Sequence, residues 1–225
     1  MIHLTQTAVL AESGGIRKLA EEFAETGCAR LPGFMDPRLL NPLLNWLESA
    51  RFQVKNELHE GRVFGTTLFV PSSEPSLFLL HFILNRPALF KEVERVTGCA
   101  KLGNFTGRIH RTSIESHHHI DWHDDRVHTR TVGINIGLST ESYTGGMFQL
   151  RDAQGRVRAE VGRTAAGDAF LFRIGEGWQH RLTPVESGRR TVAVGWFLLE
   201  PDWQQFAKME FRTRFISGQP EAAGL

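Results

Sequence analysis

Several protein classes are excluded by what the sequence has little of. The only two cysteines, Cys28 and Cys99, form no CxxC pattern, which favours a reduced compartment and two small buried apolar residues. Lys plus Arg (26) nearly cancel Asp plus Glu (25), so no net field attracts nucleic acid or an anionic membrane. The first residues lack the basic start and apolar run of a signal peptide, and no apolar segment is long enough to span a bilayer. We therefore expect a cytoplasmic protein with no nucleic-acid or membrane partner.

The sequence also lacks repeats, low-complexity tracts and Ser/Gly linkers. A chain of 225 residues is long enough to form one domain with a single hydrophobic core. The residue pattern nevertheless changes near residue 100, from helical spacing to alternation. We predict a helical or mixed N-terminal region (1–99) integral to the domain, a β core (100–200), and a C-terminal helix with a loose tail (201–225).

Helices dominate the predicted N-terminal region. Residues 16–27 carry apolar side chains at helical spacing and end at Gly27. Residues 36–50 begin with Asp as the N-cap and Pro at the first helical position, while Pro42 predicts a kink or a break between two short helices. Three further elements are a short strand at 28–34 and helices at 73–85 and 86–98.

Alternation indicates strands after residue 100. In 131–139 the apolar Val132, Ile134, Ile136 and Leu138 share one face, and the small or polar face resembles the wall of a ligand cavity. Further strands are predicted at 145–152, 156–161, 168–174, 180–185 and 190–200, separated by Gly-rich turns. Many short, regularly spaced strands predict a sandwich or barrel.

The chemistry is concentrated in residues 117–125, "HHHIDWHDD", which contain two overlapping His-x-Asp patterns. On a strand, residues i and i+2 share a face, so either His119–Asp121 or His123–Asp125 can present an imidazole and a carboxylate to one point. We favour His123–Asp125, which runs directly into the alternating strand. A third ligand from a later segment is expected at His128 or His180.

The order of these residues resembles that of the iron(II)/2-oxoglutarate-dependent oxygenases, especially their prolyl-hydroxylase-like branch. That family carries His-x-Asp, a distant His and a basic residue about ten positions later, filled here by His123, Asp125, His180 and Arg190. Intervening landmarks also match: Gly145–Gly146, "GDAFLF" (167–172), Pro184–Val185 and Gly188. The resemblance covers roughly residues 100–200.

The resemblance implies a double-stranded β-helix (jelly-roll) core, mainly β, with the N-terminal helices packed on its outer sheet. It also implies a metal site for Fe(II) at His123, Asp125 and His180, and Arg190 as the cation that binds the far carboxylate of 2-oxoglutarate. O2 is the oxidant, and ascorbate an optional reductant. Relatives that halogenate lack the carboxylate of Asp125, so its presence favours hydroxylation.

Further cosubstrate contacts are less sharply indicated. Many members of the family place Ser or Thr two residues after the Arg, where this chain has Val192. Thr131 and Asn135 are the candidate additional cosubstrate contacts, and Thr191 lies nearby in sequence. Arg108 and Arg111, on the strand that leads to the site, are weaker candidates.

The substrate is left open among a small metabolite, an amino acid and a peptide side chain. We expect residues 59–75 and 112–121 to form loops over the cavity, with no assigned role for His117, His118, His119 or Asp121. Trp122, Trp178 and Trp196 are interpreted as barrel core. Both a monomer and a homodimer fit the sequence. Two alternative functions are a cupin-like metal enzyme that does not use 2-oxoglutarate and a non-catalytic metal-binding jelly roll.

Overall fold

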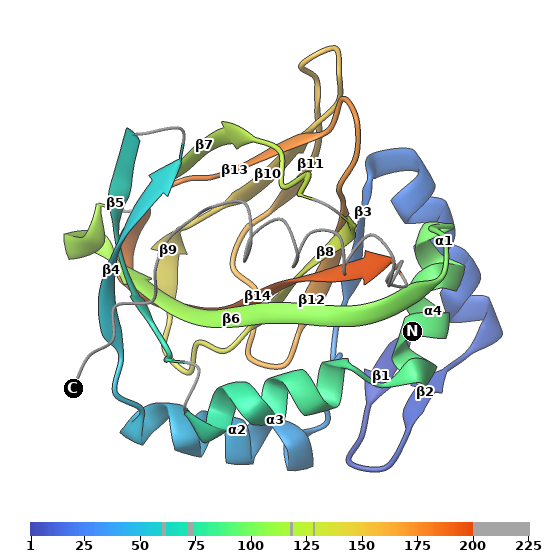
Figure 1. Ribbon diagram of the computed structural model, residues 1–225, viewed down its shortest axis with the longest axis horizontal. Coiled ribbons are helices and arrows are strands. Elements are labelled where there is room, and N and C mark those ends of the chain that lie inside the picture. Colours follow the sequence, from blue (N-terminus) through green and yellow to red (C-terminus); the bar gives the residue numbers. More distant parts are fainter. Residues whose placement is uncertain (60–61, 72–73, 118, 128, 200–225) are drawn as a thin grey trace, which may run out of the picture.

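The computed structural model describes residues 1–59, 62–71, 74–117, 119–127 and 129–199. Its centre is a pair of antiparallel sheets that face each other (Figure 1). The larger sheet has the order β3-β12-β8-β14-β6-β5-β4, with β9 paired to β14, and the smaller has the order β11-β10-β13-β7. This arrangement is the predicted double-stranded β-helix.

The strand bounds of the larger sheet are β3 Cys28–Leu31, β4 Gln53–His59, β5 Arg62–Phe69, β6 Leu102–Ser113, β8 Arg130–Gly137, β9 Tyr143–Gly145, β12 Ala169–Arg173 and β14 Val185–Leu199. Those of the smaller sheet are β7 Ile120–His123, β10 Phe148–Arg151, β11 Val157–Val161 and β13 Gln179–Leu182. A separate hairpin joins β1 Ile2–Leu4 to β2 Val9–Ala11, and a 3₁₀ turn, η1, covers Ile114–Ser116.

The described residues of the N-terminal half form four helices: α1 Ser13–Thr26, α2 Pro37–Ser49, α3 Pro75–Leu84 and α4 Pro87–Thr97. In Figure 1, α2 and α3 lie side by side along β6, whereas α1 and α4 lie together at one end of the sheet. Gly27 and Gly98 end α1 and α4 in the left-handed conformation that glycine adopts without steric cost. The helices predicted at these four places are therefore confirmed.

The sequence predicts a kink or a break at Pro42; the helix α2 runs on through Pro42, so the break is wrong. A proline inside a helix cannot donate to the carbonyl four residues earlier, here that of Arg38. The side-chain amide of Gln6 donates to this carbonyl instead, at 3.4 Å. Four leucines of α2 are buried against the core, which favours the continuous helix: Leu39, Leu40, Leu43 and Leu47.

The apolar residues of the sheets divide between two core clusters. The larger cluster joins the helices to the outer face of the large sheet and includes the predicted apolar face of β8, with Val132, Ile134 and Ile136 no more than 1% exposed. The smaller cluster lies between the two sheets and is built on Phe148, Phe172 and their neighbours. Because β8 contacts the helices on one side, its other face is left to the space between the sheets.

The predicted loop at 59–75 is largely a strand. Residues 62–69 form β5, which pairs with β4 and, through Leu68 and Phe69, with β6. Most of this pairing is with β4, which directly precedes β5, whereas the pairs with β6 join segments about 40 residues apart in the chain. Residues 112–121 also include ordered elements, namely the end of β6, η1 and the start of β7.

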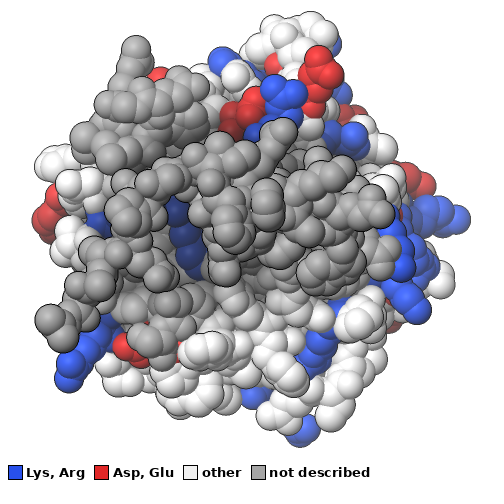
Figure 2. All heavy atoms as spheres, viewed as in Figure 1, with Lys and Arg blue, Asp and Glu red and all other residues white. Residues whose placement is uncertain are grey.

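Strands from the N-terminal region share the large sheet with those that follow residue 100. β3 pairs with β12, and β5 pairs with β6. No helix among the described residues is long and apolar enough to cross a membrane. On the face shown in Figure 2, basic and acidic side chains are interspersed around the rim. The predicted helix at 201–215 and the tail lie outside the described residues.

Candidate active site

A cavity of about 70 Å³ opens between the two sheets and holds the main candidate residues. His123, Asp125 and His180 line it, and one potential ligand atom from each lies within 4.8 Å of the others. The two histidines are direct partners on the antiparallel strands β7 and β13, and their rings lie 4.2 Å apart between centroids. Asp125 follows the end of β7 by two residues.

A break in register selects His123 over His119. His180 lies opposite His123 and Leu182 lies opposite Ile120, so two steps along β13 match three along β7. All four of these residues line the cavity. The extra residue on β7 acts as a β-bulge, which shifts the alternation of side chains.

This bulge answers the ambiguity of the two His-x-Asp patterns. His119 and Asp121 are exposed and do not line the cavity. Trp122, predicted as barrel core, belongs to neither core cluster of the described residues; the guanidinium groups of Arg151 and Arg181 lie 4.3 and 4.7 Å from its ring centroid. His117 is exposed in a left-handed conformation, whereas His118 and His128 lie outside the described residues.

The imidazole of His123 is oriented by a backbone carbonyl. Its Nδ1 lies 2.8 Å from the carbonyl oxygen of Asp121, which can only accept a hydrogen bond. Nδ1 therefore carries the proton, and Nε2 is left as a lone-pair donor facing Asp125 at 3.8 Å. The ring of His180 is fixed differently, by Phe148 and Phe172 at 5.5 and 4.9 Å between centroids.

Besides His123, the carboxylate of Asp125 has three further neighbours. Trp196 Nε1 donates to Oδ2 at 2.7 Å, and His180 Nε2 lies 3.4 Å from the same oxygen. Arg130 lies 3.9 Å from Oδ1 and stacks on the Trp196 ring at 3.8 Å. Burial by itself raises the pKa of Asp125, but the hydrogen bond and charge of His180 and the bond from Trp196 outweigh it and lower the pKa well below its usual range. The group is therefore ionised.

Arg190 lies inside the protein, 3% exposed, and lines the same cavity. Its Nη1 has no hydrogen-bond partner among the described residues. Burial lowers the pKa of this guanidinium, and an interaction with the Tyr143 hydroxyl partly offsets the effect. The adjacent Arg189 is exposed and pairs with Glu141 at 2.7 Å. A buried cation with an unused donor fits an anionic ligand.

Of the other two predicted cosubstrate contacts, Asn135 lines the cavity and Thr131 does not. Asn135 is 5% exposed, lines the cavity, and has an Oδ1 with no hydrogen-bond partner in the described part of the chain. Thr131 does not line the cavity, because it lies four residues, about 13 Å, farther along β8. Gly133, between them, is covered by the Phe172 ring, which a Cβ atom would meet at 2.0 Å.

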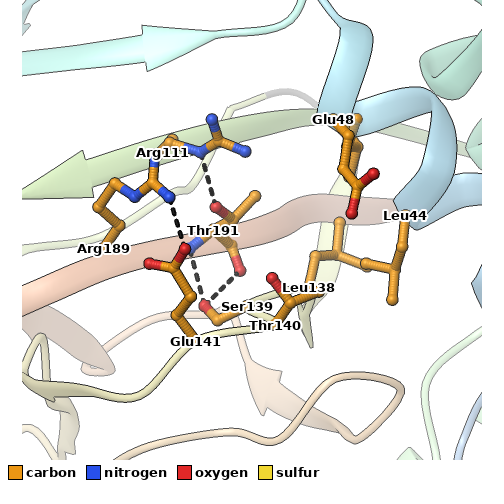
Figure 3. Close-up of a pocket in the computed structure, with 10 residues that line it drawn as sticks. Leu44, Glu48, Arg111, Leu138, Ser139, Thr140, Glu141, Arg189 and Thr191 are labelled. Atoms are coloured by element: carbon orange, nitrogen blue, oxygen red, sulfur yellow. Dashed lines mark hydrogen bonds and ion pairs between the residues drawn. The ribbon is translucent and has the colours of Figure 1, made fainter.

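Of the two weaker candidates, Arg108 lines the cavity, whereas Arg111 lies on the opposite side of the sheet. Arg111 lines a separate pocket beside α2, where its Nε donates to Thr191 (Figure 3). His110 is a cavity residue that sequence reasoning missed, although its position two residues after Arg108 puts it on the same strand face. Trp196 belongs to the core as predicted, but its bond to Asp125 was not foreseen.

Comparison with known proteins identifies the core. Residues 107–198 match the model of the 2OG-Fe(II) oxygenase superfamily. This segment, which is less than half of the chain, is similar to the core of the 2OG-Fe(II) oxygenases. It contains every cavity-lining residue named above, and the superfamily uses Fe(II), 2-oxoglutarate and O2. Among curated proteins, none matches the chain.

Several solved structures share the fold of this chain. An oxidoreductase of the 2OG-Fe(II) oxygenase family from Burkholderia pseudomallei has 16% identity and a TM-score of 0.62, over 84% of this chain and 93% of that one. A Pseudomonas putida prolyl-4-hydroxylase has 16% identity and a TM-score of 0.60, over 83% and 100%. A Trichoplax adhaerens prolyl hydroxylase, in complex with a hypoxia inducible factor peptide, has 13% identity and a TM-score of 0.61, over 88% and 97%.

Proposed function

We propose that this oxygenase binds Fe(II) through His123, Asp125 and His180 and hydroxylates an organic substrate. The observation that carries the proposal is the convergence of two imidazoles and one ionised carboxylate in a cavity that also contains a buried guanidinium. This donor set suits Fe(II) and leaves coordination positions for ligands. When bound, iron and 2-oxoglutarate supply the oxidation: O2, 2-oxoglutarate and a C–H bond give succinate, CO2 and a C–OH group.

The protein's own residues orient and isolate these groups. Arg190 would bind the far carboxylate of 2-oxoglutarate, and the unpaired Nη1 supports this role. Asn135 would add a contact from β8 once its amide turns an N–H toward the carboxylate. Phe148 and Phe172 keep water from the His180 side of the cavity. The substrate we propose is a small metabolite, an amino acid or a peptide side chain.

A binding and turnover experiment tests the function. Metal-free protein given Fe(II) and 2-oxoglutarate without oxygen is expected to develop a visible charge-transfer absorption band. In air, succinate should then accumulate, faster in the presence of the right substrate class. Absence of both signals favours the cupin-like alternative, whereas metal binding that raises only the melting temperature favours a non-catalytic jelly roll.

Trp196 is predicted to act on the metal through Asp125. In Trp196→Phe the indole N–H is lost while most of the buried ring remains, so one carboxylate oxygen is no longer held. We expect Fe(II) affinity to fall about 10-fold, the lower end of the range for residues that orient metal ligands. Titration of the metal-free protein measures this.

Trp178→Phe is the matched control, because Trp178 packs on the same core cluster but against Gly27. Its Fe(II) affinity should stay within about twofold of the wild type. Equal losses in the two variants would show that the effect comes from packing rather than from the bond to Asp125.

A further inference from the structure

The hydroxyl that many relatives place two residues after the basic residue is missing here, and the structure contains a replacement for it. The position is occupied by Val192, which is 1% exposed and has no polar group to offer. A carboxylate has about four acceptor sites, more than a bidentate pair with Arg190 fills, so a further donor beside Arg190 can be used.

Nearby hydroxyls are used elsewhere. Thr191 faces away from Arg190, as successive residues on a strand do, and its Oγ1 accepts a hydrogen bond from Arg111 in the pocket of Figure 3. The Tyr143 hydroxyl accepts from the Thr164 N–H and interacts with Arg190, so it supports the guanidinium itself.

Thr112 lies directly opposite Arg190 in the register of β6 and β14. Directly opposed residues on antiparallel strands share a face, with Cβ atoms about 5 Å apart. Thr112 is not itself among the residues that line the cavity, but Arg190 opposite it does line the cavity, as do Arg108 and His110 at the same parity on β6. Their shared face is therefore the cavity side of the sheet.

Both opposed side chains have an unused polar atom. Thr112 is 1% exposed, and neither its Oγ1 nor the Nη1 of Arg190 has a hydrogen-bond partner among the described residues. Leaving two such atoms buried on neighbouring strands is costly, whereas one carboxylate accepts from both.

We propose that the Thr112 hydroxyl donates a hydrogen bond to the far carboxylate of 2-oxoglutarate, beside Arg190. This proposal rests on the proposed function. It makes Thr112 a cosubstrate-binding residue that selects 2-oxo acids with a second carboxylate, since an acid without that group leaves the hydroxyl unpaired.

Thr112→Val tests the proposal, because valine keeps the shape of threonine and removes the hydroxyl. Calorimetric titration of the iron-loaded protein without oxygen should show 2-oxoglutarate binding weakened roughly 10-fold to 100-fold, as for a lost hydrogen bond to a charged group. Binding of 2-oxobutanoate, which has no far carboxylate, should change less than about twofold. Thr112→Ser should restore 2-oxoglutarate affinity to within about threefold of the wild type.

Thr191→Val is the control, since it removes a buried hydroxyl from the neighbouring strand on the opposite face. It should leave 2-oxoglutarate affinity within about twofold. If Thr112→Val is poorly folded by thermal melting, the comparison moves to Thr112→Ser and Thr112→Cys, of which only the serine variant should bind normally.

Two results overturn the proposal. One is wild-type affinity for 2-oxoglutarate in Thr112→Val, and the other is an equal loss for 2-oxoglutarate and 2-oxobutanoate. In either case the wild type still binds 2-oxoglutarate, so the proposed function stands. A wild type that binds no 2-oxoglutarate rejects both.

Discussion

Arg190→Ala is expected to raise the KM for 2-oxoglutarate about 100-fold or more. Arg190 is 3% exposed and its Nη1 is unpaired among the described residues, so a bound carboxylate would lose its main cationic partner in a water-poor cavity. Removing one member of a buried, hydrogen-bonded charge pair costs about 2–5 kcal/mol, and each 1.4 kcal/mol is tenfold in affinity. Succinate formation as a function of 2-oxoglutarate concentration measures the effect.

Arg189→Ala is the matched control for this charge. Arg189 is adjacent in sequence, but it is exposed and pairs with Glu141 on the surface. Exposed pairs contribute little, so the KM should stay within about twofold. If Arg190→Ala and Arg189→Ala raise the KM equally, the effect comes from the overall positive charge of the protein. The proposed contact between Arg190 and 2-oxoglutarate in the cavity is then wrong.

His180→Ala and Asp125→Ala are expected to lose Fe(II) binding and with it at least about 100-fold of 2-oxoglutarate turnover. Each variant removes one of three donors whose ligand atoms lie within 4.8 Å of one another. Changes to residues that only orient ligands already cost about 10-fold to 100-fold, so loss of a ligand should cost more. Metal content after dialysis and succinate formation are the two measurements.

The second His-x-Asp pattern supplies the control variants. His119→Ala and Asp121→Ala change the same residue types within six positions of the site, but both side chains are exposed and outside the cavity. They should retain iron and turnover within about twofold. If His180→Ala retains iron and His119→Ala loses it, the metal site lies at His119 and Asp121 instead.

The sequence was most informative where local chemistry is strong. Gly27 marked the end of α1, because the left-handed C-cap conformation is costly for other residues. The apolar face of β8 was read correctly because its side chains are buried in the same core cluster as the apolar residues of the helices. Sequence order also placed Arg190 and Asn135 in the cavity, since side chains alternate regularly on β14 and β8.

The errors occurred where pairing and packing between segments, rather than the local residue pattern, decide the outcome. Pro42 predicts a break locally, but four buried leucines and the amide of Gln6 compensate for the lost hydrogen bond. The segment before α3 was expected to be a loop, yet β5 gains its backbone hydrogen bonds from β4 and β6. Thr131 has the right parity for the cavity but lies too far along its strand.

By itself, the sequence determined the family pattern, the order of the candidate ligands and the change from helices to a β core, because each depends on residue type and spacing along the chain. Only the tertiary structure decided which His-x-Asp pair faces the cavity and which hydroxyl lies opposite Arg190. The physical reason is register: a bulge on β7 against β13 breaks the alternation that makes the two pairs equivalent, and the pairing of β6 with β14 sets Thr112 beside a residue 78 positions away.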